Sequence, residues 1–501
     1  MAGGIFNTMN KARPGAYINF KTTPEEVSYI GERGIVTMAL PLHWGGENKL
    51  IELSANDLRD GNSLSKVGLV NTESDALLLN LLLQNCTTAK LYNTYKNGVK
   101  ATATLTVPDT YVLTSDTEII SGKTYYTRSG TGTTEDPYEY TVVASPDVSD
   151  IATYYEKLSG VTVTAKHPGT FGNKIAIVVT DMQNFFVVET YANGYYVETQ
   201  KVTDAQSLVS NDYVDFVTDG RILTATNSIL LSGGSDGTLM DGSEYLTQEK
   251  YFGLLKATKF HTIGSNTTSE EDKVKIIQFI EDMRDKEGKY VQGVVANAEP
   301  ANANYEGIIN VVNGVILNDG TTISAADFVA WVTGATAGAS IAESLTGMIV
   351  PNAIGIVDPL NNDEIIEGLN NGKFILSLNQ NGTVKVEKDI NSLHTFVSGG
   401  KDYDFSKNRV IRELDEIGSN IEDIWEQTYL GKVSANAEGR ELFKSSLINL
   451  LTELRDEGAI QAFNTDSIIV EQGPDIDSVI ASIAVQPLDS MEFLYMTVNI
   501  S

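Results

Sequence analysis

The sequence ends with Met491-Glu492-Phe493-Leu494-Tyr495-Met496-Thr497-Val498-Asn499-Ile500-Ser501. From Leu494 onward every second side chain is apolar, which is the period of a β-strand with one buried face. A strand at the end of a chain presents unpaired backbone groups along its edge. It must therefore either close a sheet of its own chain or add to a sheet of another chain. The first outcome is typical of an ordinary globular protein and the second of an assembly subunit.

Length, charge and composition limit the kind of protein. The chain has 501 residues, and at roughly 100–200 residues per domain this length predicts several domains. A formal net charge of -30 opposes binding to nucleic acids and anionic membranes, because both are bound through Lys and Arg. With 42% hydrophobic and 20% charged residues, the composition is that of a folded chain. We therefore expect a multidomain protein with no nucleic-acid partner.

Targeting signals and cysteines limit the cellular compartment and the kinds of covalent or metal cross-link that the chain can form. The N-terminal sequence lacks the cationic segment and apolar run of a secretory signal, and no apolar run approaches the roughly 20 residues of a membrane helix. The single cysteine, Cys86, excludes an intrachain disulfide and a metal site built from several thiolates. We expect a protein that is made and assembled in a cytoplasm, with no membrane partner.

Apolar periodicities predict an α/β multidomain fold with an extended strand arm at each end. The predicted parts are an N-terminal arm (1–24), an α/β domain (25–95 plus 245–380), a β-rich outer domain (96–244), an α+β C-terminal domain (381–490) and a C-terminal strand (491–501). In the N-terminal arm, Tyr17, Ile18 and Phe20 belong to an alternating strand over 16–21. Both ends of the chain are thus expected to carry a strand.

Residues 107–158 are expected to form a small β insert at the surface of the outer domain. They are rich in Tyr, Thr and Ser and show no helical periodicity. Two similar stretches, 124–130 and 153–160, predict two paired strands of one module. The flanking stretches 101–105 and 161–165 alternate cleanly and would continue each other as a hairpin if the insert were removed.

The remaining periodicities predict long helices. The predicted ranges are 73–84, 270–286, 325–344, 410–424 and 438–457. The last helix is expected to stop at Gly458, since glycine readily takes the conformation that ends a helix. Within 325–344, Gly334 and Gly338 stand four residues apart on one helix face, which indicates close packing against another element. They do not form a phosphate loop, because no Gly-Lys-Ser/Thr follows.

No group of residues predicts catalysis or metal binding. The stretch Gly233-Gly234-Ser235-Asp236-Gly237 fits the Gly-x-Ser-x-Gly of a hydrolase, but turn residues follow where that motif needs a helix. The four histidines stand singly, without the spacing that places two ligands on one helix face. The Asp-rich loop 236–244 misses the calcium-binding pattern of an EF-hand. We therefore expect a protein that is not an enzyme and holds no cofactor.

Two small basic clusters stand out on this acidic chain. The first contains Lys407, Arg409 and Arg412, and the second contains Arg440 and Lys444. Such clusters usually form ion pairs within their own chain. The alternative is a contact with an acidic protein partner, in which complementary charge fixes the register of the two surfaces.

The last third of the sequence carries a specific combination of motifs. They are Arg409-Val410-Ile411-Arg412-Glu413-Leu414 with Ile417 and Ile421, Gly439-Arg440 at a helix start, the stretch 454–463, and Val485-Gln486-Pro487-Leu488-Asp489-Ser490-Met491-Glu492. Further segments agree in order, at 13–20, 167–173, 231–237, 294–297 and 307–314. In this order the motifs resemble those of contractile phage tail sheath proteins, especially of Gram-positive myophages, prophage particles and R-type bacteriocins. The resemblance covers nearly the whole chain except residues 107–158.

The resemblance implies a subunit that stacks as hexameric rings around a tail tube and contracts to drive the tube through a bacterial envelope. Its partners would be further copies of itself, the tail tube protein, and baseplate and tail terminator proteins, in a virion tail or a bacteriocin particle. It also implies that both strand-bearing ends are exchanged between subunits. The residues that this exchange would involve are Tyr17, Ile18, Phe20, Phe493, Leu494, Tyr495, Met496, Val498 and Ile500. The candidates for a tube contact are Lys407, Arg409, Arg412, Arg440 and Lys444.

The Tyr-rich insert suggests an alternative function. Exposed aromatic rings suit the faces of sugars, so residues 107–158 would fit a surface adhesin that binds glycans. The missing secretory signal opposes this interpretation.

Overall fold

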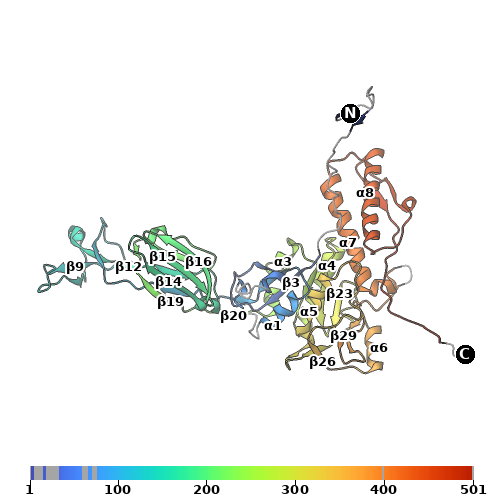
Figure 1. The fold of residues 1–501 in the computed structure, drawn as a ribbon, viewed down its shortest axis with the longest axis horizontal. Helices are drawn as coiled ribbons and strands as arrows, with labels where there is room; N and C mark the ends of the chain where they lie inside the picture. Colours follow the sequence, from blue (N-terminus) through green and yellow to red (C-terminus); the bar gives the residue numbers. More distant parts are fainter. Residues whose placement is uncertain are drawn as a thin grey trace. The chain divides into compact units, whose positions relative to one another are not determined.

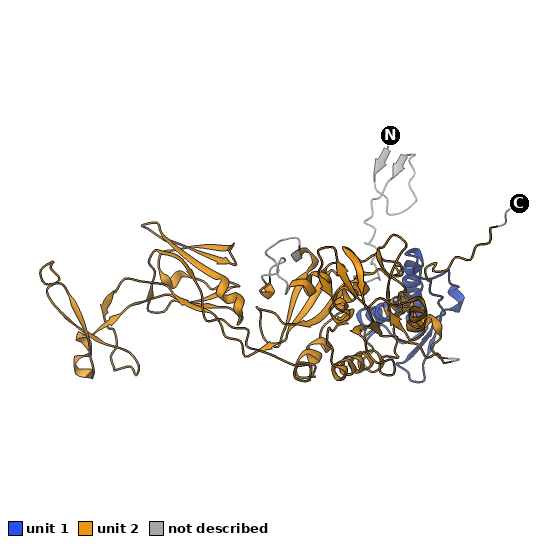
Figure 2. Ribbon diagram, turned by 90° about the horizontal axis from the view of Figure 1, so that it is seen from below, with its two compact units in different colours: residues 1–32, 416–488 blue, residues 33–415, 489–501 orange. Residues whose placement is uncertain are grey.

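The computed structural model describes residues 2–4, 15–17, 33–58, 66–69, 76–397 and 400–498 (Figure 1). The chain forms two compact units, the first from residues 1–32 and 416–488 and the second from residues 33–415 and 489–501 (Figure 2). Helix α7 (Asn408–Ile424) begins in the second unit and ends in the first. The division therefore falls inside the stretch 381–490, which the sequence predicted as one domain.

A seven-stranded sheet forms the centre of the second unit. Its strands are β3 (Ile35–Leu40), β4 (Leu50–Ser54), β5 (Thr88–Asn93), β21 (Thr262–Gly264), β22 (Gln292–Ala296), β23 (Ile308–Val311) and β27 (Lys373–Phe374). Their order is β27-β23-β22-β21-β3-β5-β4, and only β4 runs antiparallel to its neighbour. The parallel pair β3–β21 joins the two sequence blocks, before 95 and after 245, in one sheet. This confirms the mixed α/β class.

Helices cover both faces of this sheet, as buried parallel strands require. The helices of the second unit are α1 (Leu77–Leu83), α2 (Gly242–Tyr245), α3 (Tyr251–Lys256), α4 (Glu270–Asp285), α5 (Ala325–Gly338) and α6 (Asn362–Asn370). Along β3, Val36 and Met38 join the core that contains α1 and α5, whereas Ala39 joins the core that contains α3 and α4. The helix predicted at 270–286 is confirmed to within one residue.

Helix α5 packs very closely against α1. A Cβ added at Gly338 would lie 1.6 Å from the carbonyl oxygen of Asn85, and one at Gly334 would lie 2.2 Å from that of Leu82. The close-packing interpretation of the two glycines is therefore confirmed. The helix was predicted to reach 344, which is wrong, because the backbone becomes extended at Ala339 and the following residues form a turn.

Residues 101–240 form the β-rich part of the second unit. One sheet has the order β17-β13-β7 and another β16-β15-β14-β19, and apolar side chains of both share one core. The strands are β7 (Thr102–Thr104), β13 (Thr162–Ala165), β14 (Ile175–Asp181), β15 (Phe186–Ala192), β16 (Tyr195–Val202), β17 (Val214–Val217) and β19 (Thr226–Leu230). Strand β13 pairs antiparallel with β7, which confirms that the segments on either side of the insert continue each other.

The insert has a sheet of its own with the order β10-β9-β11-β8. Its elements are β8 (Tyr111–Leu113), β9 (Tyr126–Ser129), β10 (Glu139–Val142), the 3₁₀ helix η4 (Val148–Thr153) and β11 (Tyr155–Lys157). Tyr126 of β9 lies opposite Tyr155 of β11, so the two similar stretches of the sequence are paired strands, as predicted. Tyr125, Ile151 and Tyr154 form a small separate core.

Shorter elements complete the second unit and the N-terminal residues. The strands are β1 (Ala2–Gly4), β2 (Gly15–Tyr17), β6 (Tyr95–Lys96), β12 (Ser159–Gly160), β18 (Arg221–Ile222), β20 (Thr238–Leu239), β24 (Gly314–Leu317), β25 (Thr322–Ile323), β26 (Ala353–Val357), β28 (Leu376–Leu378) and β29 (Val384–Val386). The 3₁₀ helices are η1 (Ala55–Leu58), η5 (Thr170–Lys174), η6 (Ala205–Ser207) and η7 (Tyr403–Ser406).

Residues 416–488 of the first unit form helices and one hairpin. After the end of α7 come a π-helical turn, η8 (Trp425–Tyr429), and helix α8 (Ala437–Asp456). The Asn436 side chain accepts from the Gly439 N–H and starts α8, and Gly458 with φ +77° follows its end, as predicted. The 3₁₀ helix η9 (Thr465–Ser467) and the strands β30 (Ile469–Gln472) and β31 (Val479–Ser482) complete the unit.

Two kinds of feature are absent from the described ranges. None of their helices combines the length and apolar character needed to cross a membrane. Within the same residues, no three His, Cys, Asp or Glu side chains are grouped so that they could hold a metal ion.

We predict that Gly338→Ala lowers the free energy of unfolding of the second unit by about 1–3 kcal/mol, because the methyl group forces α5 away from α1. The matched control is Gly355→Ala, whose added Cβ would lie 3.5 Å from Ile316 in ordinary contact. Thermal unfolding of the two variants measures the difference. Equal melting temperatures would contradict the close-packing interpretation.

Candidate functional site

The C-terminal segment, defined as residues 493–498, is extended and exposed. The exposed fractions are 84% for Leu494, 91% for Tyr495, 72% for Met496 and 72% for Val498. The segment pairs with no strand among the residues that the structure describes. The predicted strand over 491–501 is thus not formed within the described single chain, because an extended segment becomes a strand only beside another edge. Ile500 lies outside the described residues.

A buried ion pair, the Lys407–Glu492 clamp, fixes the residue just before this segment. The ammonium of Lys407 binds the Glu492 carboxylate and lies 3.1 Å from Asp489, and both clamp side chains are less than a tenth exposed. Thr346 donates its hydroxyl to Glu492 Oε1 at 2.8 Å. Burial by itself lowers the pKa of Lys407, but the hydrogen bond and the negative charge of Glu492 more than offset this and hold the pKa above its usual value.

The carboxylate of Asp389 extends the clamp into the core of the second unit. Its Oδ2 accepts from the Arg412 guanidinium at 2.9 Å and from the Leu345 N–H at 3.0 Å, and its Oδ1 accepts from the Asn408 side chain at 2.8 Å. The Asp389 N–H donates to the same Thr346 hydroxyl that binds Glu492. A continuous hydrogen-bonded chain therefore joins the start of α7 to the residue that precedes the C-terminal segment.

The first basic cluster faces inward. Arg412 is fully buried and also donates to the Glu343 carbonyl at 2.6 Å, and Arg409 contacts Glu413 at 3.3 Å on the same helix. Together with the clamp, these contacts favour the interpretation of Lys407, Arg409 and Arg412 as ion pairs within the chain. A tube contact by any of them would require it to leave a buried partner, which is costly. The sequence did not single out Glu492 and Asp389, the partners of Lys407 and Arg412, although Glu492 lies in one of the quoted motifs.

The second basic cluster lies on α8 in the first unit. Arg440 is half-buried and donates to the Ala435 carbonyl at 3.4 Å, and Lys444 is half-exposed one turn further on. Their partial exposure leaves them as candidates for a contact with another protein.

The hairpin of β30 and β31 offers free edges in the first unit. The two strands pair in antiparallel register from Ile469–Ser482 to Gln472–Val479 and form a sheet of their own. Within the described residues, neither strand has a second neighbour, and Ile469 and Ile480 are about half exposed. Such a sheet is suited to accept an added strand. The sequence predicted short strands here. It did not predict that their edges are free, because only the folded sheet shows which edges have a neighbour.

The N-terminal exchange residues are described only in part. Tyr17 is the last residue of β2, which pairs in parallel with β1, opposite Gly4. Ile18 and Phe20 lie outside the described residues.

The Gly233–Gly237 stretch is a loop, as the sequence predicted, and not a nucleophile elbow. Ser235 pairs with Val99 in an isolated β-bridge, and the next helix starts only at Gly242. Asp236 accepts from the Thr170 N–H at 2.7 Å and contacts His43 Nδ1 at 2.9 Å, so its carboxylate ties neighbouring loops together.

We predict that Glu492→Gln loosens the clamp, because the amide removes the charge opposite buried Lys407 while Asp489 still compensates in part. The free energy of unfolding should fall by about 1–3 kcal/mol. Limited proteolysis should cut the chain after residue 488 faster than in the unchanged protein. The control is Glu367→Gln on the exposed face of α6, and an equal effect of both substitutions would argue against the clamp.

Two family models match the chain in consecutive stretches. Residues 245–392 match the model of the phage tail sheath protein central domain, and residues 400–501 match the model of the phage tail sheath C-terminal domain.

Relatives and solved structures match over nearly the whole length. The chain is 31% identical to the phage-like element PBSX protein XkdK of Bacillus subtilis, with 100% of both chains covered. It is 33% identical to the solved sheath tail protein of Desulfitobacterium hafniense, over 95% of this chain and 97% of the other, with a TM-score of 0.68. The sheath tail protein of Listeria innocua is 31% identical over 92% and 93% of the two chains, with a TM-score of 0.72. On this identity and coverage, the chain belongs to the phage tail sheath protein family.

Proposed function

We propose that the chain is the repeating subunit of a contractile sheath, stacked as hexameric rings around a tail tube. Contraction of these rings drives the tube through the bacterial cell envelope. The structural role in a tail sheath follows from the family, whose members are structural proteins and not enzymes. The partners in this proposal are further copies of the chain, the tail tube, and the baseplate and tail terminator proteins, in a particle assembled in the host cytoplasm.

The observation that carries the proposal is an exposed apolar segment with a fixed base. Apolar side chains exposed to this degree in a row are unfavourable in water, and they are normally covered by a partner. The Lys407–Glu492 clamp holds the start of the segment in the second unit, while Leu494, Tyr495, Met496 and Val498 are exposed and accessible to another subunit. Strand donation uses both properties, because the donor must remain attached while its segment completes a foreign sheet.

Strand donation also suits a lattice that contracts. A donated segment and its acceptor are different surfaces, so the contact is heterologous and continues from copy to copy without closing as a dimer. In this proposal the donated strands keep neighbours connected while the domains change their packing. The energy for contraction comes from the extended lattice itself, which is metastable relative to the contracted one.

The glycan-binding alternative receives less support from the insert. The rings of Tyr111 and Tyr140 stack on each other with centroids 3.8 Å apart. The Arg128 guanidinium lies over the rings of Tyr138 and Tyr155, at 4.3 and 4.8 Å from their centroids. Each of these contacts occupies one face of a ring, which leaves less aromatic surface for a sugar.

We predict that a chain ending at Glu492 folds but forms no sheath tubes, because it keeps the clamp and lacks the donated segment. Electron microscopy of the purified protein detects the tubes, and the melting temperature shows that the fold is retained. The control carries a Gly-Ser replacement of residues 107–158, which removes a module with its own sheet and core and leaves the segment in place. Normal tubes from the chain that ends at Glu492 would refute strand donation.

We further predict that Arg440→Glu and Lys444→Glu, alone and together, weaken binding to the tail tube without preventing tubes of sheath alone. Charge reversal replaces attraction by repulsion at an acidic partner surface. Co-sedimentation with purified tail tubes at low and high salt measures the effect. The control is Arg455→Glu at the other end of α8, where Arg455 pairs with Asp456. Unchanged tube binding by the double variant would show that the two residues do not contact the tube.

A further inference from the structure

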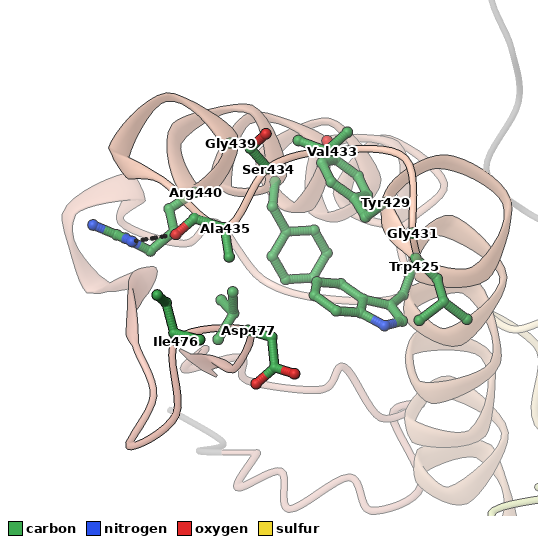
Figure 3. A pocket seen from close by; sticks show the side chains of 13 residues that line it. Trp425, Tyr429, Gly431, Val433, Ser434, Ala435, Gly439, Arg440, Ile476 and Asp477 are labelled. Carbon is green, nitrogen blue, oxygen red and sulfur yellow. Dashed lines mark hydrogen bonds between the residues drawn. The ribbon is translucent and has the colours of Figure 1, made fainter.

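Aromatic clusters with exposed apolar borders occur in both units. In the first unit, Trp425, Tyr429 and Phe443 line a cavity of about 570 Å³ (Figure 3). Ile476 and Asp477, in the turn between β30 and β31, complete the lining, so this cavity belongs to the hairpin already described. The second cluster lies on the insert 107–158, which the family motifs of the sequence do not cover.

One face of the insert sheet, which contains β9 (Figure 1), carries a cluster of aromatic rings around one cation. Side chains alternate along a strand, so Tyr126 and Arg128 lie on this face, whereas the core residue Tyr125 lies on the opposite one. We define the Tyr–Arg face by residues Tyr111, Tyr126, Arg128, Tyr138, Tyr140 and Tyr155. Its apolar neighbours Leu113 and Val142 are more than half exposed, so the borders of the face are open to solvent.

Arg128 lies in this face without an acidic partner. Its guanidinium lies over the rings of Tyr138 and Tyr155, at 4.3 and 4.8 Å from their centroids. Among the described residues it forms no ion pair, whereas the other two basic residues of the insert are both paired with carboxylates. Stacking on aromatic rings uses the plane of a guanidinium and leaves the N–H donors at its edge available. Arg128 is therefore held in position to bind a carboxylate of another molecule.

The same insert carries carboxylates that lack a basic partner. We define the acidic rim as Glu135, in the turn before β10, and Glu139, in β10 at the edge of the sheet. Both are exposed, and within the described residues neither forms an ion pair. Glu139 lies opposite Ser129 in the register of β9 and β10, on the face that points away from Arg128. The rim and the Tyr–Arg face thus have complementary charge, but Glu139 does not reach Arg128 of its own copy.

We propose that the Tyr–Arg face of one insert binds the acidic rim of the insert of a second copy. The two surfaces are different, so the contact is heterologous and repeats from copy to copy. This inference rests on the proposed sheath, in which many copies are neighbours, and it adds a contact to strand donation. The contact stabilises the assembled sheath and is not needed to form it.

Composition and charge favour a second copy as the occupant of this face. Tyr and Arg are enriched among the residues that contribute most to binding in protein interfaces. Each copy has a net charge of -30, so neighbouring copies repel one another unless local contacts of opposite charge offset the repulsion. An unpaired Arg on one surface and unpaired Glu side chains on another provide such a contact. Its formation also removes Leu113 and Val142 from water.

Charge reversal at Arg128 tests the contact. Arg128→Glu in the full chain should still form tubes by strand donation, but these tubes should dissociate more readily, because a carboxylate then faces the acidic rim. After dilution into urea, the fraction of protein that still sediments as tubes should fall by more than about threefold relative to the unchanged protein.

Thr127→Glu is the matched control, since it adds a negative charge one residue away on the opposite face of β9, and its tubes should resist urea like those of the unchanged protein. Tubes of Arg128→Glu with unchanged resistance would overturn the proposal and leave strand donation intact. Absence of tubes even from the unchanged protein would overturn the sheath role and the insert contact together.

Reversing both partners separates a lost contact from a damaged insert. A chain with Arg128→Glu, Glu135→Lys and Glu139→Lys restores opposite charges between copies, and its tubes should regain most of the lost resistance to urea. An insert that Arg128→Glu had merely unfolded would not be rescued in this way. Failure of the triple variant to recover would overturn the assignment of the acidic rim.

A cross-link without a spacer gives direct evidence. Heavy-isotope and unlabelled copies with Arg128→Lys are mixed, assembled and treated with a water-soluble carbodiimide, which activates a carboxyl group so that an amine in contact with it forms an amide. Mass spectrometry should find position 128 of one copy joined to Glu135 or Glu139 of a copy with the other isotope label. Links of position 128 only within one copy, or only to carboxylates outside the insert, would overturn the proposal.

Discussion

The carboxylate of Asp389 holds together the part of the structure on which the C-terminal segment depends. It binds the fully buried Arg412, the Asn408 side chain and the Leu345 backbone, and through Thr346 it reaches Glu492. A buried charge is tolerated only when it is paired and hydrogen-bonded, so none of these groups can move alone at low cost. The first turns of α7 and the residues before the segment are therefore fixed to the same core.

This arrangement separates an anchored base from a free end within a few residues. Glu492 is buried in the clamp, whereas Leu494 is almost fully exposed. The contrast is what a donated strand requires, since an unanchored end would lose more conformational entropy on capture and a buried end would not reach a neighbour. Membership in the phage tail sheath family is consistent with this geometry, because a sheath is an assembly of many copies and each copy has neighbours that an exposed segment can contact.

Several local features followed directly from the sequence. The spacing of Gly334 and Gly338 predicted close helix packing, and the alternation at 101–105 and 161–165 predicted strands that pair across the insert. The end of α5 was predicted too late, because small residues permit a helix and also permit the turn that replaces it. The pairing of Arg409 with Glu413 lies within one helix turn, whereas the partners of Lys407 and Arg412 were not predictable, since Glu492 and Asp389 are distant in sequence.

The sequence by itself determined the periodicities, the family motifs and the absence of a credible catalytic pattern. It also showed that the last residues alternate like a strand, because the order of side chains along a chain fixes which of them share a face. The tertiary structure alone decided that residues 493–498 have no partner strand within the described chain, that their base is clamped, and that an aromatic cavity lies beside a free hairpin edge. These are properties of segments far apart in sequence, and only folding determines which of them meet.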